Sequence, residues 1–441
     1  MAKNAGSMTH FDHDAIRGFV HAGRVHRKVY TDPDVFALEV ERIFGCAWNY
    51  VGHQSQVPNP GDYFATTIAN RPVVMVRHSD GQIRVLQNHC AHRGAKVISD
   101  RSGNAKLLRC CYHGWTYRTD GTLHSIPRPG GYAGTAVAAD ESQFGMSALN
   151  TECYRGFVFA TFSDTAVALG EFLTDAGKSL DNMVDRSPLG ELEVVGGCFR
   201  ALFRNNWKIY LENLHDGMHP LTVHGSSIAA SKSQERKVAE RPDADPSLAL
   251  QIISANSQTP KQMEELQVTC YPNGHSDMRG FRNPLSDEPA YREYTSALEE
   301  QHGRSRTEEI LGTNMHNVCF YPNASAHPSF LQMRVITPVA VDRTLVEVWS
   351  FRLRGAPDEL FQRTIVYANT VHSPSSMIKA DDLESYRRVQ DGLAEPGREW
   401  ISQHRGLDEA KSGEPAGSAL NEHYIRNQYR AWLNYMCDPA P

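Results

Sequence analysis

The sequence predicts an α+β protein in which a small all-β domain precedes a larger domain, built from an antiparallel sheet flanked by helices. The first observation is length, since 441 residues exceed what one ordinary hydrophobic core accommodates. The second is a run of short β-rich segments with turn signals, and the third is the mixture of strand-like and helix-like segments after it. We expect a helical segment at 1–45 that packs on the larger domain, the all-β domain at 46–163, and the larger domain at 164–441.

Residues 1–163 are expected to form one helical stretch followed by strands. Asp34–Phe44 carries apolar residues at helical spacing. Turn signals at Pro60-Gly61, Asp80-Gly81 and Asp120-Gly121 punctuate the β-rich part. The expected strands are Tyr63–Ile68, Val73–Arg77, Ile83–Gln87 and Gly156–Phe162.

The larger domain is expected to begin with a helix at Leu169–Met183. Residues 225–312 are polar and poorly patterned, so we expect a long excursion that is helical at 288–302. Such segments often form lids or substrate loops. The expected strands are Gly197–Phe203, Asn317–Tyr321, Gln332–Thr337 and Thr344–Leu353, and the expected later helices are 357–371, 381–393 and 422–436.

Composition limits the classes of partner. Hydrophobic residues make up 40% and charged residues 22%, and the net charge is −6 with no large basic block, so we expect no nucleic-acid partner. No stretch approaches the length of a membrane span, and the opening residues lack the apolar core of a signal peptide. The nine cysteines are an odd number at scattered positions, which is not typical of a disulfide framework. We therefore expect a cytoplasmic protein with no membrane partner.

The first candidate metal site consists of two pairs of cysteine and histidine. Cys90 and His92 are followed, after seventeen residues, by Cys110 and His113. Two such pairs on loops of a small β domain match a Rieske [2Fe–2S] centre, in which two cysteines bind one iron and two histidines bind the other. The alternative is a structural zinc ion with the same four ligands. We favour the cluster, because this spacing is unusual for a zinc finger and no helix carries the histidines.

The second candidate site contains Asp216, His219 and His224. On a helix, Asp216 and His219 would share a face. His219 and His224 would lie about 500° apart around an ideal helix, so they meet at one metal only if the helix is distorted. Pro220 lacks a backbone donor, and we expect the helix to bend or end between the histidines. Two histidines and a carboxylate would form the facial triad of a non-haem iron site with open positions for dioxygen.

The spacing of the residues does not decide which acidic side chain supplies the carboxylate of this triad. Asp216 is nearest, but it is also well placed to orient the other ring nitrogen of His219. The acidic segment Asp381–Glu384 offers Asp382, with Asp381 or a surface capping role as alternatives.

Together these motifs resemble those of the α subunits of Rieske non-haem iron ring-hydroxylating oxygenases, from about Trp48 to Trp432. The resemblance includes the segment Asn206-Trp207-Lys208 and an acidic pair ahead of Gln390-Asp391-Gly392, which implies Asp382 as the third iron ligand. It also implies a helix-grip type of catalytic domain. The anchoring residues are Cys90, His92, Cys110, His113, Asp216, His219 and His224.

The resemblance also assigns catalytic roles. Asp216 would connect a cluster histidine of a neighbouring subunit to His219, so electrons would pass from His113 of the neighbour through Asp216 to the iron. Asn213 would lie beside the iron ligands. The resemblance therefore implies a homotrimer, and the sequence leaves open whether a small β subunit completes an α3β3 assembly. A reductase, with or without a ferredoxin, would deliver electrons from NAD(P)H.

Segments around Asn317–Asn323, Arg334–Pro338 and Asp381–Arg387 look most like the benzoate, anthranilate and salicylate oxygenases, which implies an aromatic carboxylate substrate and oxygenation by O2 at the ring. Arg334 and Arg352 are candidate partners of that carboxylate, although strand arginines are usually solvated. The expected wall of the substrate pocket is Met218, Leu221, Thr222, Ile228, Phe320 and Phe330. The alternatives are a Rieske monooxygenase for O- or N-demethylation and a Rieske electron-transfer protein.

Overall fold

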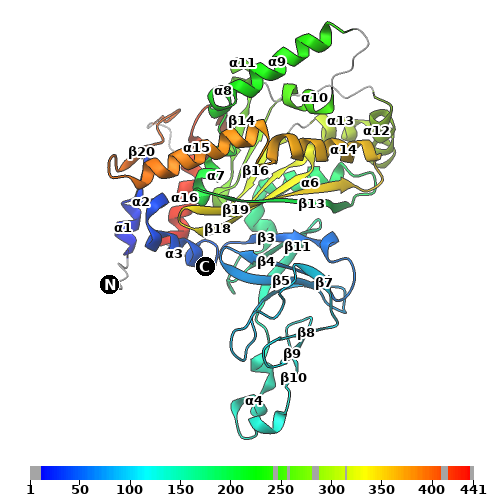
Figure 1. Ribbon diagram of the computed structural model, residues 1–441, viewed down its shortest axis with the longest axis vertical. Helices are drawn as coiled ribbons and strands as arrows, with labels where there is room; N and C mark the ends of the chain where they lie inside the picture. Colours follow the sequence, from blue (N-terminus) through cyan, green and yellow to red (C-terminus); the bar gives the residue numbers. More distant parts are fainter. Residues whose placement is uncertain are drawn as a thin grey trace. The chain divides into compact units, whose positions relative to one another are not determined.

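The computed structural model describes residues 11–241, 247–255, 259–280, 288–312, 315–408 and 416–437 (Figure 1). It divides into two compact units. Phe44–Glu171 form the smaller unit, and the segments through Ile43 and from Phe172 onward form the larger one. Each unit has its own antiparallel sheets, and the predicted α+β class is confirmed.

The smaller unit is built on a seven-stranded sheet with the order β3-β12-β11-β6-β5-β4-β7. A three-stranded sheet, β10-β9-β8, adjoins the second pair of predicted cluster ligands. Gly81 and Gly121 adopt φ angles of 85° and 93°, as the predicted turns require. The strands are β3 Asn49–His53, β4 Asp62–Ile68, β5 Arg71–Arg77, β6 Ile83–Gln87, β7 Ser102–Asn104, β8 Leu107–Arg109, β9 Thr116–Arg118, β10 Leu123–Ser125, β11 Ala148–Tyr154 and β12 Phe157–Thr161; the one α-helix of this unit that the structure describes before Leu169 is α4 Ala136–Ala139.

The larger unit is built on an eight-stranded antiparallel sheet with the order β13-β19-β18-β17-β16-β15-β14-β21. Helices α14 and α15 lie along this sheet, where they contact β19 and β13 (Figure 1). The strands are β13 Leu192–Phe203, β14 Gln267–Cys270, β15 Ser276–Arg279, β16 Met315–Phe320, β17 Ala324–His327, β18 Gln332–Ala340, β19 Arg343–Leu353 and β21 Ala416–Ser418.

The helices of the larger unit supply most of the site described below. They are α6 Lys178–Asp185, α7 Trp207–Asn213, α8 His219–Val223, α9 Gly225–Ala239, α10 Leu248–Ala255, α11 Pro260–Glu265, α12 Pro289–His302, α13 Arg304–Gly312, α14 Asp358–Tyr367, α15 Met377–Ala394 and α16 His423–Cys437. Helix α14 continues into a wider turn at Ala368–His372. The predicted helices at 357–371, 381–393 and 422–436 are confirmed within a few residues at their ends.

The N-terminal segment is less helical than expected. The helix predicted at Asp34–Phe44 is confirmed as α3 Pro33–Arg42, with Asp32 as its N-cap. The residues before it form α1 His13–Arg17, the hairpin β1 Val20–His21 and β2 Arg24–His26, and α2 Lys28–Thr31. The hairpin continues into β20 Trp400–Ser402, and a β-carbon at Gly23 would lie 2.6 Å from the ring of His404. This close approach explains why a glycine occupies that position.

The expectation that 225–312 is an excursion was wrong for much of its length. The helix at 288–302 is confirmed as α12, but the segment also contains α9, α10, α11 and the sheet strands β14 and β15. Both strands have only four residues and include Thr269, Ser276 and Asp277, so their composition gives little strand signal. Their pairing with each other and with β16 and β21 decides their conformation. Residues 242–246, 256–258 and 281–287 lie outside the described part of the chain.

Candidate active site

The four predicted cluster ligands lie on two loops with the same backbone pattern. The Cys90 amide donates to the Ala95 carbonyl, and the Gly94 amide donates to the Cys90 carbonyl, both at 2.8 Å. Cys110 repeats both bonds with Trp115 and Gly114, at 2.8 and 3.1 Å. The two glycines have φ angles of 69° and 73°, a region that favours glycine. Two matched loops of this kind present two matched pairs of ligands.

The ligand side chains are graded in exposure. Cys90 and Cys110 are buried, His92 is half-buried, and His113 is exposed. The two imidazole rings are 4.5 Å apart between centroids, and Trp115 stacks on His92. This grading places the thiols inside and an imidazole edge at the surface, as required for a cluster that exchanges electrons with a partner.

The arrangement fits a two-iron cluster better than a single zinc ion. The two thiols are buried and the two imidazoles lie further out and next to each other, so the donors form a sulfur pair and a nitrogen pair, as the two irons of a Rieske cluster require. The residues therefore fit the cluster. The sequence did not suggest Tyr117, whose hydroxyl lies 3.0 Å from the Cys90 sulfur and accepts the Ala91 amide at 3.1 Å. Hydrogen bonds to ligand sulfurs tune the reduction potential of such clusters.

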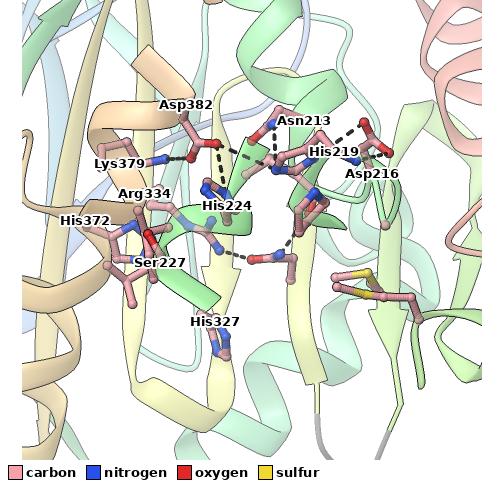
Figure 2. Close-up of a pocket in the computed structure, with 18 of the residues that line it drawn as sticks. Asn213, Asp216, His219, His224, Ser227, His327, Arg334, His372, Lys379 and Asp382 are labelled. Carbon is pink, nitrogen blue, oxygen red and sulfur yellow. Dashed lines mark hydrogen bonds and ion pairs between the residues drawn. The ribbon is translucent and has the colours of Figure 1, made fainter. Parts of the chain in front are cut away.

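The second candidate site brings together His219, His224 and Asp382. Nε2 of His224 lies 3.2 Å and Nε2 of His219 lies 3.7 Å from Oδ1 of Asp382 (Figure 2). The three ligand atoms lie within 4.8 Å of one another, and this is the one such set found among the described residues. Oδ1 of Asp382 is buried, and neither imidazole reaches it with hydrogen-bond geometry. Three lone pairs that converge without bonding one another are what a metal ion requires, and two histidines with one carboxylate suit iron.

The chain reaches this geometry through two short helices and the break between them. Helix α7 ends at Asn213, residues 214–218 are not helical, and α8 begins at His219. Pro220 therefore occupies the first turn of α8, where its missing amide has no consequence. Helix α8 ends at Val223, so the predicted end between the two histidines is confirmed, and His224 lies between α8 and α9.

Both imidazoles have a second carboxylate behind them. Nδ1 of His219 faces Oδ2 of Asp216 at 3.4 Å, and Nδ1 of His224 faces Oδ2 of Asp381 at 3.6 Å. Burial alone would raise the pKa of Asp216, but its contacts with His219 and with the Met218 and His219 amides hold that pKa below its ordinary value. An ionised carboxylate at Nδ1 keeps the proton on that nitrogen and directs the lone pair of Nε2 to the metal position.

Further residues fix the ligands, and the sequence did not suggest two of them. Lys379 donates to Oδ2 of Asp382 at 2.8 Å, which leaves Oδ1 for the metal position. Burial raises the pKa of Asp382, but Lys379, His224 and His219 outweigh this and hold it well below its ordinary value. The predicted Asn213 lies with Nδ2 at 3.1 Å from Nε2 of His219, and Tyr386 donates to its Oδ1 at 2.6 Å.

A cavity of about 1010 Å³, including its opening to solvent, adjoins these ligands. Of the six residues predicted for its wall, Ile228 lines it. Leu221 packs instead on the core around Met263, and Thr222 is exposed. Phe320 points away because it lies three positions from Asn317 on β16, and alternate strand residues face opposite sides.

Met218 and Phe330 also lie outside the lining, although Phe330 stacks on Tyr367, which lines the cavity, at 3.7 Å between ring centroids. Most of the apolar wall comes from the segment 225–312, in which the sequence predicted an excursion but no individual wall residue except Ile228. The apolar residues that line the cavity are Leu214, Ile253, Met263, Leu266, Met278, Val371 and Ile378.

Among the described residues, no helix has the length and apolar character needed to cross a membrane.

Comparison with known proteins agrees with these two sites. Residues 47–139 match the model of the Rieske [2Fe-2S] domain, and residues 179–436 match that of the ring hydroxylating alpha subunit catalytic domain. This chain belongs to the family of ring-hydroxylating dioxygenase α subunits. It is therefore an oxidoreductase of the Rieske non-haem iron type, and the predicted family and cofactors, a [2Fe–2S] cluster and a mononuclear iron, are confirmed.

Curated relatives of this α subunit include two at 31% identity. One is the toluate 1,2-dioxygenase subunit alpha of Pseudomonas putida, over 86% of this chain and 81% of the relative. The other is the anthranilate 1,2-dioxygenase large subunit of Acinetobacter baylyi, over 87% and 80%. Among solved structures, naphthalene 1,2-dioxygenase with indole bound shares the fold at a TM-score of 0.79 and 23% identity, with 96% of this chain and 94% of that chain covered. A quaternary ammonium Rieske monooxygenase shares it at 0.68 and 21%, with 96% and 98% covered.

Proposed function

We propose that this α subunit is the terminal oxygenase of a multicomponent system that dihydroxylates an aromatic carboxylate. The observation that carries the proposal is a cavity that joins the His219–His224–Asp382 group to a buried arginine, Arg334. The 31% identity to subunits of toluate and anthranilate dioxygenases supports an acidic aromatic substrate.

In the proposed assignment, Cys90, His92, Cys110 and His113 hold the cluster, and His219, His224 and Asp382 hold the mononuclear iron. When bound, the cluster supplies single electrons and the mononuclear iron supplies dioxygen activation. The chain's own residues orient the ligands, exclude water from the apolar part of the cavity and bind the substrate. Tyr386 holds the Asn213 side chain beside the His219 ring, and Lys379 restricts the Asp382 carboxylate.

Electron delivery is proposed to follow the family's arrangement of partners. A reductase, directly or through a ferredoxin, passes electrons from NAD(P)H to the cluster, and Asp216 links a neighbour's cluster to His219 in a homotrimer. Asp216 contacts His219 and is partly exposed, so its carboxylate can contact both the iron site and a residue of a neighbouring subunit, which supports this role. The relatives are named as alpha or large subunits, which supports a smaller β subunit here as well. We place the system in the cytoplasm.

The fold similarity to a quaternary ammonium monooxygenase raises demethylation as the alternative reaction. A quaternary ammonium group needs an anionic or aromatic environment. Lys379 is already paired with Asp382, but Arg334 brings to this cavity a cation that has no acidic partner among the described residues. The charges therefore favour an anionic substrate.

The test is a screen of aromatic acids with the reconstituted system, in which oxygen uptake is compared with NADH oxidation. We expect at least one small aromatic acid to yield one cis-diol for about each molecule of oxygen taken up and each NADH oxidised, as dioxygenation requires. Formaldehyde release from a methoxylated or N-methylated acid, without ring oxidation of any acid, would support the demethylase alternative instead.

A further inference from the structure

Arg334 is a buried cation that has no acidic partner among the residues that the structure describes. It lies on β18, opposite Ser325 and Val348 on the adjacent strands, and it is 4% exposed. Its Nη2 donates to the neutral side-chain oxygen of Asn317, and its Nε has no hydrogen-bond acceptor among the described residues. Lys379, the other cation in the lining, is already paired with Asp382 at 2.8 Å. Arg334 thus retains unused donor capacity and an uncompensated charge.

The position of the Arg334 guanidinium is fixed by a hydrogen-bonded chain. The Asn317 side chain, which accepts from Arg334, donates to the Leu214 carbonyl at 2.8 Å. The Asn317 carbonyl lies 3.0 Å from Nε2 of His215, and the other ring nitrogen of His215 lies 2.9 Å from the hydroxyl of Ser276. Four residues therefore hold this cation in one orientation, and none of them neutralises it.

Two more buried polar groups line the same cavity without partners. Neither ring nitrogen of His372, which is 6% exposed, makes a hydrogen bond within the described structure. The hydroxyl of Ser227, which is 2% exposed, also has no partner there. Burial, and then the charges of Arg334 and Lys379, lower the pKa of His372 well below its ordinary value, so its ring is neutral and carries one N–H donor. Figure 2 shows Arg334, His372 and Ser227 among the residues around the pocket.

Buried groups of this kind cost free energy unless a ligand satisfies them. An isolated buried charge is far more costly than a buried hydroxyl, so the charge of the ligand decides whether the site is occupied. A carboxylate has two oxygens that match the planar donors of a guanidinium. The remaining wall is apolar and suits a ring.

We propose that Arg334 binds the carboxylate of the aromatic acid, with His372 and Ser227 as additional donors, and thereby sets the position of the ring relative to His219, His224 and Asp382. This inference rests on the proposed function and deepens it, because it assigns the acid selectivity to one side chain. Arg352, the other candidate arginine, lies outside the cavity lining and stacks on Phe361 at 4.9 Å.

The test is calorimetric titration of the metal-loaded protein, without oxygen, with benzoate and with its neutral isostere benzamide. We expect the native protein to prefer benzoate. Arg334→Gln should lose about 100-fold in affinity for benzoate, the typical effect when a buried charge loses its partner, and less than about threefold for benzamide. The benzoate affinity of Arg334→Lys should lie between those of the native protein and Arg334→Gln, because lysine keeps the charge but not the planar pair of donors. Arg352→Gln is the matched control and should bind both ligands as the native protein does.

Thermal unfolding separates a binding role from a structural one. The unliganded Arg334→Gln protein should be at least as stable as the native protein, because the substitution removes an uncompensated buried charge. The rise in Tm that benzoate gives the native protein should be absent. Unchanged benzoate binding in Arg334→Gln, an equal loss for both ligands, or a lower Tm of the unliganded variant would overturn the proposal.

The proposed function fails by a different result. If the native protein oxidises no aromatic acid in the coupled screen, the function is wrong whatever Arg334 binds. If the native protein oxidises benzoate and Arg334→Gln binds benzoate normally, the proposed function stands, but Arg334 does not bind the carboxylate.

Discussion

At the scale of single residues, Asp382 is the side chain that both iron-site histidines and Lys379 contact. Its Oδ1 faces both imidazoles, its Oδ2 is occupied by Lys379, and its position in α15 places it across from α8. The Lys379 contact reserves one oxygen for the metal position and favours binding through a single oxygen. The paired carboxylates Asp216 and Asp381 then give His219 and His224 equivalent surroundings.

The first prediction concerns Asp382→Ala. Loss of one of three ligands should release the mononuclear iron while the cluster stays, so that iron falls from about three to about two atoms per chain and acid-labile sulfide stays at about two. Metal analysis and the paramagnetic signal of the reduced cluster measure both. Glu384→Gln, on the same helix but paired at the surface with Arg387 and Arg388, is the control and should keep all its iron. Full iron content in Asp382→Ala would remove Asp382 from the ligand set.

The second prediction concerns Asp216→Asn. The amide keeps the shape of the side chain but not its charge, so both metal centres should load and the cluster should remain reducible. Turnover should fall by at least about 100-fold, because the substitution changes the link between centres rather than either centre. Steady-state oxygen uptake and stopped-flow oxidation of the reduced cluster measure this effect. Near-native turnover would exclude Asp216 from the electron path.

The residues near the metals could be predicted to different extents. Cysteine and histidine spacing indicated the cluster ligands and the two iron histidines, because those donors are close in sequence. Spacing left the choice between Asp216, Asp381 and Asp382 open, since α15 meets α8 only in the folded chain. Lys379 and Tyr386 carry no signal of their own in the sequence, and their roles depend on the turn of α15 that faces the site.

At the scale of elements, a buried acidic residue joins three helices. Glu39 on α3 is fully buried and accepts from Lys208 at 2.6 Å and from Trp207 at 2.8 Å, both on α7. It also accepts from Trp432 on α16 at 2.7 Å. The N-terminal segment is thereby attached to the helix that leads into the iron ligands.

The third prediction concerns Glu39→Ala. The change leaves the buried Lys208 ammonium without its counter-charge and two indole N–H groups without an acceptor, so the free energy of unfolding should fall by about 3–5 kcal/mol. Denaturant unfolding monitored by tryptophan fluorescence measures the loss. Glu41→Ala, on the exposed side of the same helix, should change stability by less than about 0.5 kcal/mol. Equal effects of the two substitutions would contradict the structural role of Glu39.

The fourth prediction concerns pH and Glu212. This residue of α7 accepts from Tyr30 and Tyr429, both at 2.9 Å, and burial raises its pKa to about 7. The folded state therefore holds the proton more tightly than the unfolded state, and the stability gained from it is lost as pH rises from about 4.5 to 7. Glu212→Gln should lack this fall, which we expect to be roughly 2 kcal/mol between pH 5 and 7.5. Urea midpoints of both metal-loaded proteins at the two pH values provide the measurement, and parallel pH profiles would contradict the assignment.

Elements with a regular pattern could be predicted, and those held by long-range pairing could not. The strands β4, β5 and β6 alternate or form apolar runs between clear turns, and they were expected within two residues. The strands β14 and β15 are short and polar, and they exist because β16 and β21 pair with them. The predicted wall of the cavity was largely wrong for the same reason, since Met263, Leu266 and Met278 belong to that unassigned region.

At the scale of the whole molecule, the chain combines an electron-carrying unit and a catalytic unit, and each was predictable from its ligand motif. The family match confirms that these motifs belong to one α subunit. We infer that one polypeptide stores electrons and also oxygenates an aromatic acid at a separate iron.

A single-turnover reaction tests this claim most directly. The fully iron-loaded protein is reduced chemically, freed of reductant, and mixed with benzoate and isotopically labelled dioxygen in the absence of any reductase. We expect the cluster to be reoxidised and a benzoate cis-diol to form with both added oxygens labelled. A cluster that stays reduced, or one that is reoxidised without any labelled aromatic product, would contradict it.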